Sequence, residues 1–216
     1  SWRYRHLITT IPLDRLVRIT PGVVRPEAAD GLLYSATNVV GVGIDGPTPD
    51  HLKTKCWMYF PDHNSPYYRV TVFTNYSPQN APRPGAQWSL MTETAESPHK
   101  PVRHDSLAEE TLLALEEDGL LPDRRAVCSV VQKHLPQGYP TPFLGRDALV
   151  DPMLRAFEQR GIFSRGRFGA WKYEVANQDH SFAQGYECVE RLVAGGGPEL
   201  EPTLFTPDIV NGRRNP

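Results

Sequence analysis

Residues that could bind an anion are concentrated between Ser164 and Gly185, in the stretch SRGRFGAWKYEVANQDHSFAQG. Arg165 and Arg167 stand beside glycines, where a backbone can approach a ligand closely. Asn and Asp accept hydrogen bonds from first-turn amides, so a helix should begin near residues 177–179. The amides and partial positive charge of that helix start suit a pyrophosphate or an electron-rich ring. A capped helix with solvated arginines explains the same residues, and both interpretations stay open.

A second group is aromatic. Side chains alternate along the expected strand TKCWMYF, so Trp57 and Tyr59 share one face. The opposite face has the composition of a core and carries Cys56, Met58 and Phe60. The next strand places Arg69 directly after two tyrosines. Aromatic rings near an arginine can stack a base or a sugar while the guanidinium binds a phosphate; the alternative is a second sheet face covered by helices. Tyr139, held in the rigid loop LPQGYPTP, is a weaker candidate.

The sequence does not support several common kinds of catalytic, metal-binding or nucleotide-binding site. The chain contains no GxSxG, its three cysteines show no CxxC spacing, and its seven histidines lack metal-ligand spacing, so no metal site is predicted. GVGIDG at 41–46 fits GxGxxG, but Pro47 and Pro49 follow and exclude the helix that a dinucleotide fingerprint requires.

Composition is that of a globular protein. The 216 residues carry a formal net charge of −2, which does not indicate a nucleic-acid binder. The apolar runs are too short for a membrane span, and cysteines without a secretory signal favour a cytoplasmic protein. Because the chain starts almost directly in a strand without an initiator Met, we expect a fragment that lacks an N-terminal part.

The elements that must position these residues are short. β-rich runs at 6–11, 38–44, 54–61, 67–76 and 87–96, separated by turn residues, predict antiparallel strands in a meander, and a further strand is expected at 126–132. A capping box at 106–109 and Asp151-Pro152 predict two helix starts, and Phe182, Tyr186, Val189 and Val193 share one face of a last helix. The fold class is therefore α+β, an antiparallel sheet with packing helices. We expect residues 1–145 to form a mainly antiparallel sheet with one helix, and 146–216 a strand-loop-helix and a surface tail, together in one compact unit.

Four stretches resemble the UDP-galactopyranose mutase family, in family order: TKCWMYFPDHNSPYYRVTVFTNYSP, HLPQGYPTP, LGRDA and RGRFGAWKYEVANQDHSF. The resemblance implies the C-terminal part of an FAD-binding, amine-oxidase-like flavoprotein without the N-terminal Rossmann fingerprint. It implies an isomerase that interconverts pyranose and furanose forms of UDP-galactose, or a related sugar nucleotide, by nucleophilic attack of reduced flavin N5 on the anomeric carbon.

The resemblance also assigns residues. It implies catalytic roles for Arg69, Arg167 and Asn177. It implies substrate binding by Trp57, Tyr59, Arg69, Tyr76, Tyr139 and Tyr173. It implies FAD contacts from Gly166, Arg167, Asn177, Gln178, Asp179, His180 and Ser181.

Two other functions stay open at this point. The parent could be an amine-oxidase-like redox flavoenzyme, or the chain could be a noncatalytic module that binds a sugar nucleotide or a partner. The chain alone is expected to be inactive, because the dinucleotide-binding part must come from a missing N-terminal part or a partner chain.

Overall fold

The computed structural model describes residues 3–62 and 64–212 and divides them into two compact units. Unit 1 combines the residues up to 34 with those from 139 onward, and unit 2 comprises residues 35–138. This division differs from the expected boundary at 145/146. The reason is that β1 (Leu7–Thr9) pairs in parallel with β7 (Ile162–Ser164), which joins both ends of the chain in unit 1. The α+β class is confirmed.

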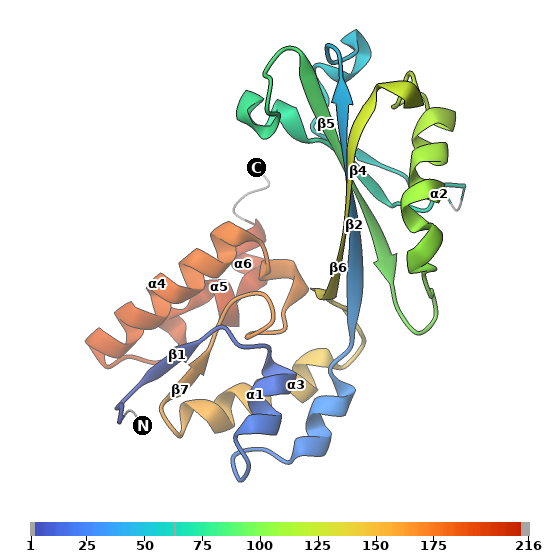
Figure 1. The fold of residues 1–216 in the computed structure, drawn as a ribbon. Coiled ribbons are helices and arrows are strands. Elements are labelled where there is room, and N and C mark those ends of the chain that lie inside the picture. Colours follow the sequence, from blue (N-terminus) through green and yellow to red (C-terminus); the bar gives the residue numbers. More distant parts are fainter. Residues whose placement is uncertain (1–2, 63, 213–216) are drawn as a thin grey trace. The chain divides into compact units, whose positions relative to one another are not determined.

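Unit 2 is built on a five-stranded sheet with the order β3-β4-β5-β2-β6 (Figure 1). The strands are β2 (Tyr34–Asp45), β3 (Trp57–Tyr59), β4 (Arg69–Val72), β5 (Gln87–Glu96) and β6 (Val127–Pro140). The pairs β3–β4, β4–β5 and β2–β5 are antiparallel. The predicted meander holds for β3-β4-β5 but not for β2, which lies between β5 and β6.

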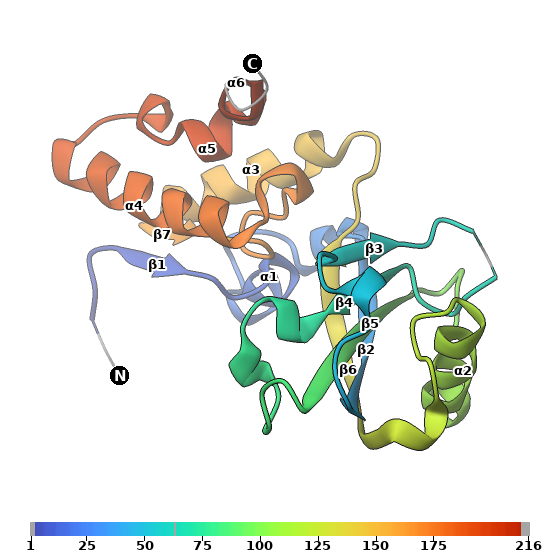
Figure 2. The same ribbon diagram turned by 90° about the horizontal axis from the view of Figure 1, so that it is seen from above.

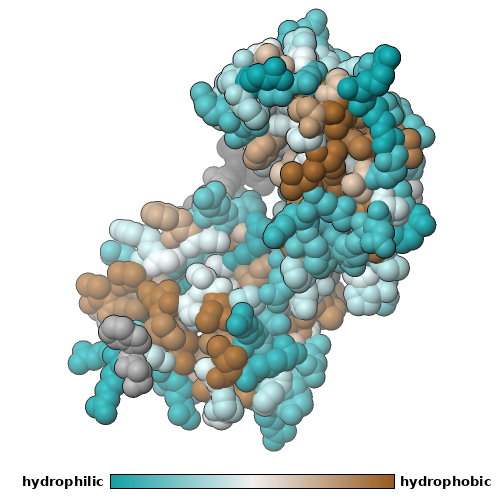
Figure 3. Space-filling model, in the orientation of Figure 1, coloured by the Kyte–Doolittle hydropathy of each residue, from teal (hydrophilic) through white to brown (hydrophobic). Residues whose placement is uncertain are grey.

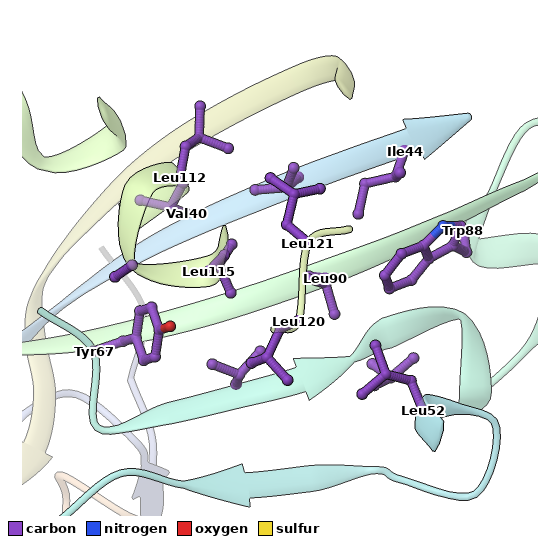
Figure 4. Packing of buried hydrophobic residues seen from close by; sticks show 14 of the residues in the cluster. Val40, Ile44, Leu52, Tyr67, Trp88, Leu90, Leu112, Leu115, Leu120 and Leu121 are labelled. Atoms are coloured by element: carbon purple, nitrogen blue, oxygen red, sulfur yellow. The ribbon is translucent and has the colours of Figure 1, made fainter. Parts of the chain in front are cut away.

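One face of this sheet is covered by α2 (His104–Glu117), as Figure 2 shows. Leu112 and Leu115 of the helix share one buried cluster with Val40, Leu90 and Trp88 of the sheet (Figure 4). The predicted capping box is wrong. The helix begins at His104, and Ser106 lies inside it and donates to Glu110 Oε1 at 2.7 Å.

Unit 1 is mainly helical. Besides β1 and β7 it contains α1 (Leu13–Ile19), α3 (Arg146–Glu158), α4 (Gln178–Ala194), α5 (Pro202–Phe205) and α6 (Pro207–Gly212). Its core packs α1 against α3, with Trp171 completely buried among them. Short 3-10 helices complete the two units at Pro26–Gly31, Asp50–Leu52, Phe73–Asn75, Pro78–Asn80, Arg124–Ala126, Tyr173–Val175 and Pro198–Leu200. No helix among the described residues is long and apolar enough to cross a membrane.

The predicted start of α3 is also wrong. The helix begins after Gly145, whose φ of +81° is accessible to glycine, and Pro152 lies in its interior. Asp151 is not a cap but forms an ion pair of 3.2 Å with the buried Lys172. A proline inside a helix costs one backbone hydrogen bond, because it has no N–H to donate. The burial of Val150 and Met153 in the core offsets this cost.

Helix α4 starts after Asn177 and ends at Gly195 (φ +67°), both as predicted. Its buried side chains, however, are His180, Gln184 and Cys188. The apolar stripe faces solvent: Phe182, Tyr186, Val189 and Val193 are 78%, 62%, 47% and 83% exposed. Apolar side chains gather on the surface over α4 in Figure 3. The tail is not confined to the surface either, because Glu201 and Leu204 are completely buried.

Candidate functional site

In unit 2, one row across three strands holds Arg69. The register places Arg69 opposite Tyr59 on one side and opposite Glu93 on the other, so all three side chains share a face of the sheet. Arg69 Nη2 donates to both oxygens of Glu93, at 2.5 and 2.6 Å. Tyr68 Oη donates to the same carboxylate at 2.5 Å. Glu93 therefore holds the guanidinium in position.

Aromatic rings surround this arginine. The Arg69 guanidinium carbon lies 5.5 Å from the Trp57 ring centre and 6.0 Å from that of Tyr59. Tyr76 meets Trp57 edge to face at 6.4 Å. Trp57, Tyr59 and Tyr76 are 55%, 62% and 47% exposed, so helices of unit 2 do not cover this face. The structure thus brings four of the predicted residues together: the exposed rings of Trp57, Tyr59 and Tyr76 surround the fixed guanidinium of Arg69. This arrangement can stack a base or a sugar.

The other face of β3 agrees only in part with the prediction. Met58 and Phe60 pack against the core, but Cys56 is exposed. Tyr67 is buried and donates to Asp118 at 2.5 Å, and burial raises the pKa of its hydroxyl.

The rejected GVGIDG stretch forms the end of β2, with Gly46 just beyond the strand, and borders a hollow of about 270 Å³ in unit 2. Gly41 and Gly43 line it together with Phe73, Met91 and Ser129. A Cβ at Gly43 would lie 2.3 Å from Ser129 Oγ, so a larger residue there would require the Ser129 side chain to move. Through Met91 and Gly41, which pair directly across β5 and β2, the hollow shares the sheet face that carries Trp57.

In unit 1, Arg165 is not available to a ligand. Its side chain is 1% exposed and donates to both oxygens of Glu201 (2.5 and 2.8 Å) and to Glu158 (2.7 Å). Arg191 binds the same two carboxylates, at 2.8 and 3.1 Å. The interpretation of Arg165 as part of an anion site is therefore corrected, because the buried Glu201 and the partly buried Glu158 neutralise it.

Arg167 has a different environment. Its Nε donates to Ala176 O at 2.8 Å, and its guanidinium lies 4.6 Å from the ring centre of Tyr139. Tyr139 in turn contacts Tyr173, with ring centres 6.0 Å apart. Among the residues that the structure describes, Arg167 forms no ion pair. The structure thus brings together three predicted residues around a cation without a carboxylate, which is what an anion site requires.

The loop that carries Arg167 is fixed by its backbone. Gly166 has φ +83°, and its amide donates to the buried Gln184 Oε1 at 2.8 Å. A Cβ at Gly169 would lie 2.2 Å from Arg165 O. Trp171 has a positive φ of 54° and is completely buried, with Nε1 donating to Leu33 O at 3.1 Å. Such a conformation is costly for a non-glycine residue and is retained only where the surroundings enforce it.

The start of α4 fits the polar edge of a flavin. Asn177 is the N-cap residue, but its side chain makes no capping hydrogen bond and therefore does not occupy a first-turn amide. Asn177, Gln178 and Asp179 are exposed and Ser181 is half-buried. The His180 side chain is buried, so only its backbone fits a cofactor-binding role. Main-chain donors at a helix N-terminus suit a ring that carries negative charge.

Sequence reasoning missed the carboxylates that decide these roles. Glu93 lies on the same face as Arg69 through strand pairing, and its position in QWSLMTETAE could have been read from the alternation once the register was known. Glu201 lies in a tail that looked irregular, and no local signal connects it with Arg165.

Comparison with known proteins places this fold within larger proteins of differing activity. No protein-family model matches the chain. A protein from Exiguobacterium sp. 255-15, provisionally assigned as a protoporphyrinogen oxidase, has a TM-score of 0.56 and 17% identity; the match covers 73% of this chain and 35% of that one. A CLA-producing fatty acid isomerase from P. acnes has a TM-score of 0.57 and 14% identity, covering 86% and 41%. At these identities the likeness shows the fold alone.

A crystal structure of reduced UDP-galactopyranose mutase is far more similar. Its TM-score is 0.90 at 44% identity, and the match covers 98% of this chain and 45% of that chain. The predicted resemblance to the UDP-galactopyranose mutase family is confirmed, for a part that spans less than half of that enzyme's length.

Proposed function

We propose that the chain is the substrate- and flavin-contacting part of an FAD-dependent isomerase that interconverts pyranose and furanose forms of UDP-galactose or a related sugar nucleotide. The observation that carries this proposal is the 44% identity to a UDP-galactopyranose mutase across 98% of the chain. That mutase was crystallised in a reduced form, so it has a redox-active state. Bound reduced FAD would supply the nucleophile for the anomeric carbon.

In unit 2, the proposed nucleotide-binding residues are Trp57, Tyr59, Arg69 and Tyr76. The exposed rings offer stacking surfaces for a base or a sugar, and Arg69 offers donors to a phosphate. Glu93 orients Arg69 and lowers the net charge beside it. Arg69 therefore contributes directed hydrogen bonds more than long-range attraction.

In unit 1, Arg167 with Tyr139 and Tyr173 is proposed to bind anionic ligand groups, and the first turn of α4 to contact the flavin. Arg167 forms no ion pair within the described part of unit 1, so its full charge can stabilise an anion. The amides of residues 178–180 lie in the first turn and point toward the N-terminus of the helix, and they would stabilise negative charge on a reduced ring. Asn177 and Gly166 are proposed to complete the cofactor contacts.

The α4 stripe supports the proposal of a further FAD-binding part. Four exposed apolar residues, Phe182, Tyr186, Val189 and Val193, follow one face of a helix whose buried face is largely polar. A surface of this kind marks a protein interface. Because the chain spans only 45% of the similar mutase, we propose that the occupant is the dinucleotide-binding part, supplied by another segment of the polypeptide or by a partner chain.

The open edges of β1 and β7 also support the proposal that a further dinucleotide-binding part packs against unit 1. Parallel sheets occur almost only as larger sheets covered on both sides, whereas this one has two strands of three residues. The dinucleotide-binding part would extend it or cover it. A cytoplasmic location remains part of the proposal, because Cys56 and Cys128 are exposed free thiols that suit a reducing compartment.

The test combines the chain with its dinucleotide-binding part, FAD and dithionite, and follows UDP-galactopyranose formation from UDP-galactofuranose by chromatography. We expect turnover only with reduced flavin. Arg167→Met should lower kcat/KM by about 10²–10³-fold, the usual loss when one charge-stabilising donor is removed. Arg160→Met, an exposed arginine on the same unit, is the matched control and should have no effect.

Other results would support the remaining hypotheses. Flavin reduction by a substrate, with oxygen consumption and no sugar isomer, would show a redox enzyme and refute the isomerase. Calorimetric binding of UDP to the chain without flavin, and no turnover with the dinucleotide-binding part present, would favour a binding module.

A further inference from the structure

Three potential metal ligands that are distant in sequence meet in unit 2. They are Glu96 at the end of β5, His104 at the start of α2 and His134 in β6. One ligand atom from each lies within 4.8 Å of the others. His104 Nε2 is 3.2 Å from Glu96 Oε1, and His134 Nδ1 is 3.5 Å from Glu96 Oε2. The two imidazole rings are 5.0 Å apart, edge to face.

The donor set matches a known coordination chemistry. Two imidazole nitrogens and one carboxylate oxygen, with a fourth position left to water, form a common zinc site. Metal–ligand bonds of roughly 2.0–2.1 Å at the tetrahedral angle place neighbouring ligand atoms roughly 3.4 Å apart. The separation between His104 Nε2 and Glu96 Oε1, 3.2 Å, is already close to this value. The 3.5 Å separation of His134 Nδ1 is to the other carboxylate oxygen, Glu96 Oε2, so the His134 ring has to move for one carboxylate oxygen and both imidazoles to bind the same ion.

Neighbouring side chains hold the ligands in place. Asn38, which is completely buried, donates from Nδ2 to Glu96 Oε2 at 2.8 Å, and its Oδ1 accepts from His134 Nδ1 at 3.0 Å, so Nε2 is the His134 nitrogen that would bind a metal. Gln132 Nε2 donates to the backbone oxygen of His104 at 2.9 Å. Hydrogen bonds of this kind orient metal ligands and reduce the ordering that binding requires.

The site is also accessible. The side chains of Glu96, His104 and His134 are 22%, 41% and 40% exposed, so an ion and its water can enter from solvent. A protonated histidine paired with Glu96 would explain one contact, but not why a second imidazole and a buried amide converge on the same carboxylate.

We propose that Glu96, His104 and His134 form a binding site for a divalent transition metal, with Zn²⁺ as the best match. A bound ion would connect the segment 97–103 and the start of α2 to the edge strand β6. The site would be structural or regulatory, and it is independent of the proposed isomerase function. The histidine spacing in the sequence did not reveal it, because each ligand comes from a different element.

The test is calorimetric titration of Zn²⁺ into the tag-free chain. We expect one saturable site per chain. Removing an outer-shell partner typically costs ten- to hundred-fold in affinity, so losing a ligand in His104→Ala, His134→Ala or Glu96→Gln should cost at least about tenfold. His51→Ala removes an exposed histidine outside the cluster and should leave the affinity unchanged. Absence of saturable binding, or equal affinity in a His104→Ala/His134→Ala double variant, would overturn the proposal.

A second measurement uses the unaltered protein and so avoids any folding defect of a variant. Zn²⁺ should protect His104 and His134 from diethyl pyrocarbonate while the exposed His51 and His99 continue to react. Equal protection of all four histidines, or of none, would show that the cluster does not hold the metal.

Discussion

Glu201→Gln should destabilise unit 1 selectively, because it breaks a buried network of four charges. Glu201 is completely buried and accepts three hydrogen bonds, two from Arg165 and one from Arg191. Glu158 is the only other carboxylate described in this network. The substitution keeps the shape of the side chain but leaves two guanidinium groups facing a single negative charge.

The expected cost is about 3 kcal/mol. Losing one charge-assisted hydrogen bond accounts for about 1.5–3 kcal/mol. Leaving a buried charge without its partner costs about 3–5 kcal/mol, but Glu158 still offsets part of that excess. The matched control is Glu199→Gln, two residues away and exposed, which should change stability by less than about 0.5 kcal/mol.

Native-state hydrogen exchange read by mass spectrometry is the suitable assay, because it resolves the two units. About 3 kcal/mol corresponds to a roughly 10²-fold faster exchange of the most protected amides, at about 1.4 kcal/mol per tenfold. This change should appear in peptides from α4 and β7, while β5 peptides keep their protection. Unchanged exchange in α4, or equal acceleration in both units, would refute the view that this network stabilises unit 1.

Two further predictions concern titrating groups. Burial raises the pKa of the Cys188 thiol to about 11, so at pH 8 a disulfide reagent should modify Cys56 and Cys128 and reach Cys188 only after unfolding; simultaneous reaction of all three would contradict this. Burial would raise the pKa of Glu174, but hydrogen bonds from Arg146 outweigh it and hold the pKa below its usual value. The ionised Glu174 therefore stabilises the fold above about pH 4.3, and this contribution is lost as the pH falls further. In urea titrations, Glu174→Gln should make the unfolding free energy fall less steeply between about pH 5 and pH 3. An unchanged slope would rule this out.

Where local signals and packing agree, the sequence was sufficient to predict the fold. Strand 87–96 was predicted at the bounds of β5, because alternating apolar residues end at turn residues on both sides. The prediction of where α3 starts was wrong. Asp151-Pro152 is a strong local signal for a helix start, but the helix that packs into the core on either side of it begins earlier, at Arg146. Local propensity is a weak prior when a long apolar face can be buried.

Helix α4 shows a different limit. Spacing predicted its length and its apolar face correctly, but periodicity says only which side chains lie together and not what covers them. The buried face is polar because Gln184 bonds to the amide of Gly166 and to Val175 O. This requires the neighbouring loop to be in place, which no pattern within the helix encodes.

The same reasoning separates the three arginines that the sequence made look equivalent. Arg165 is neutralised by Glu201 and Glu158, Arg69 shares Glu93 with Tyr68, and Arg167 bonds to a carbonyl and an aromatic ring. A buried cation paired with carboxylates has little attraction left for a ligand, whereas a cation beside neutral groups retains its attraction for an anion. The two arginines of RGRFG therefore differ: Arg165 is held by carboxylates within the fold, and Arg167 is the one for which we propose a role in binding an anion. The carboxylates from distant segments determine this division.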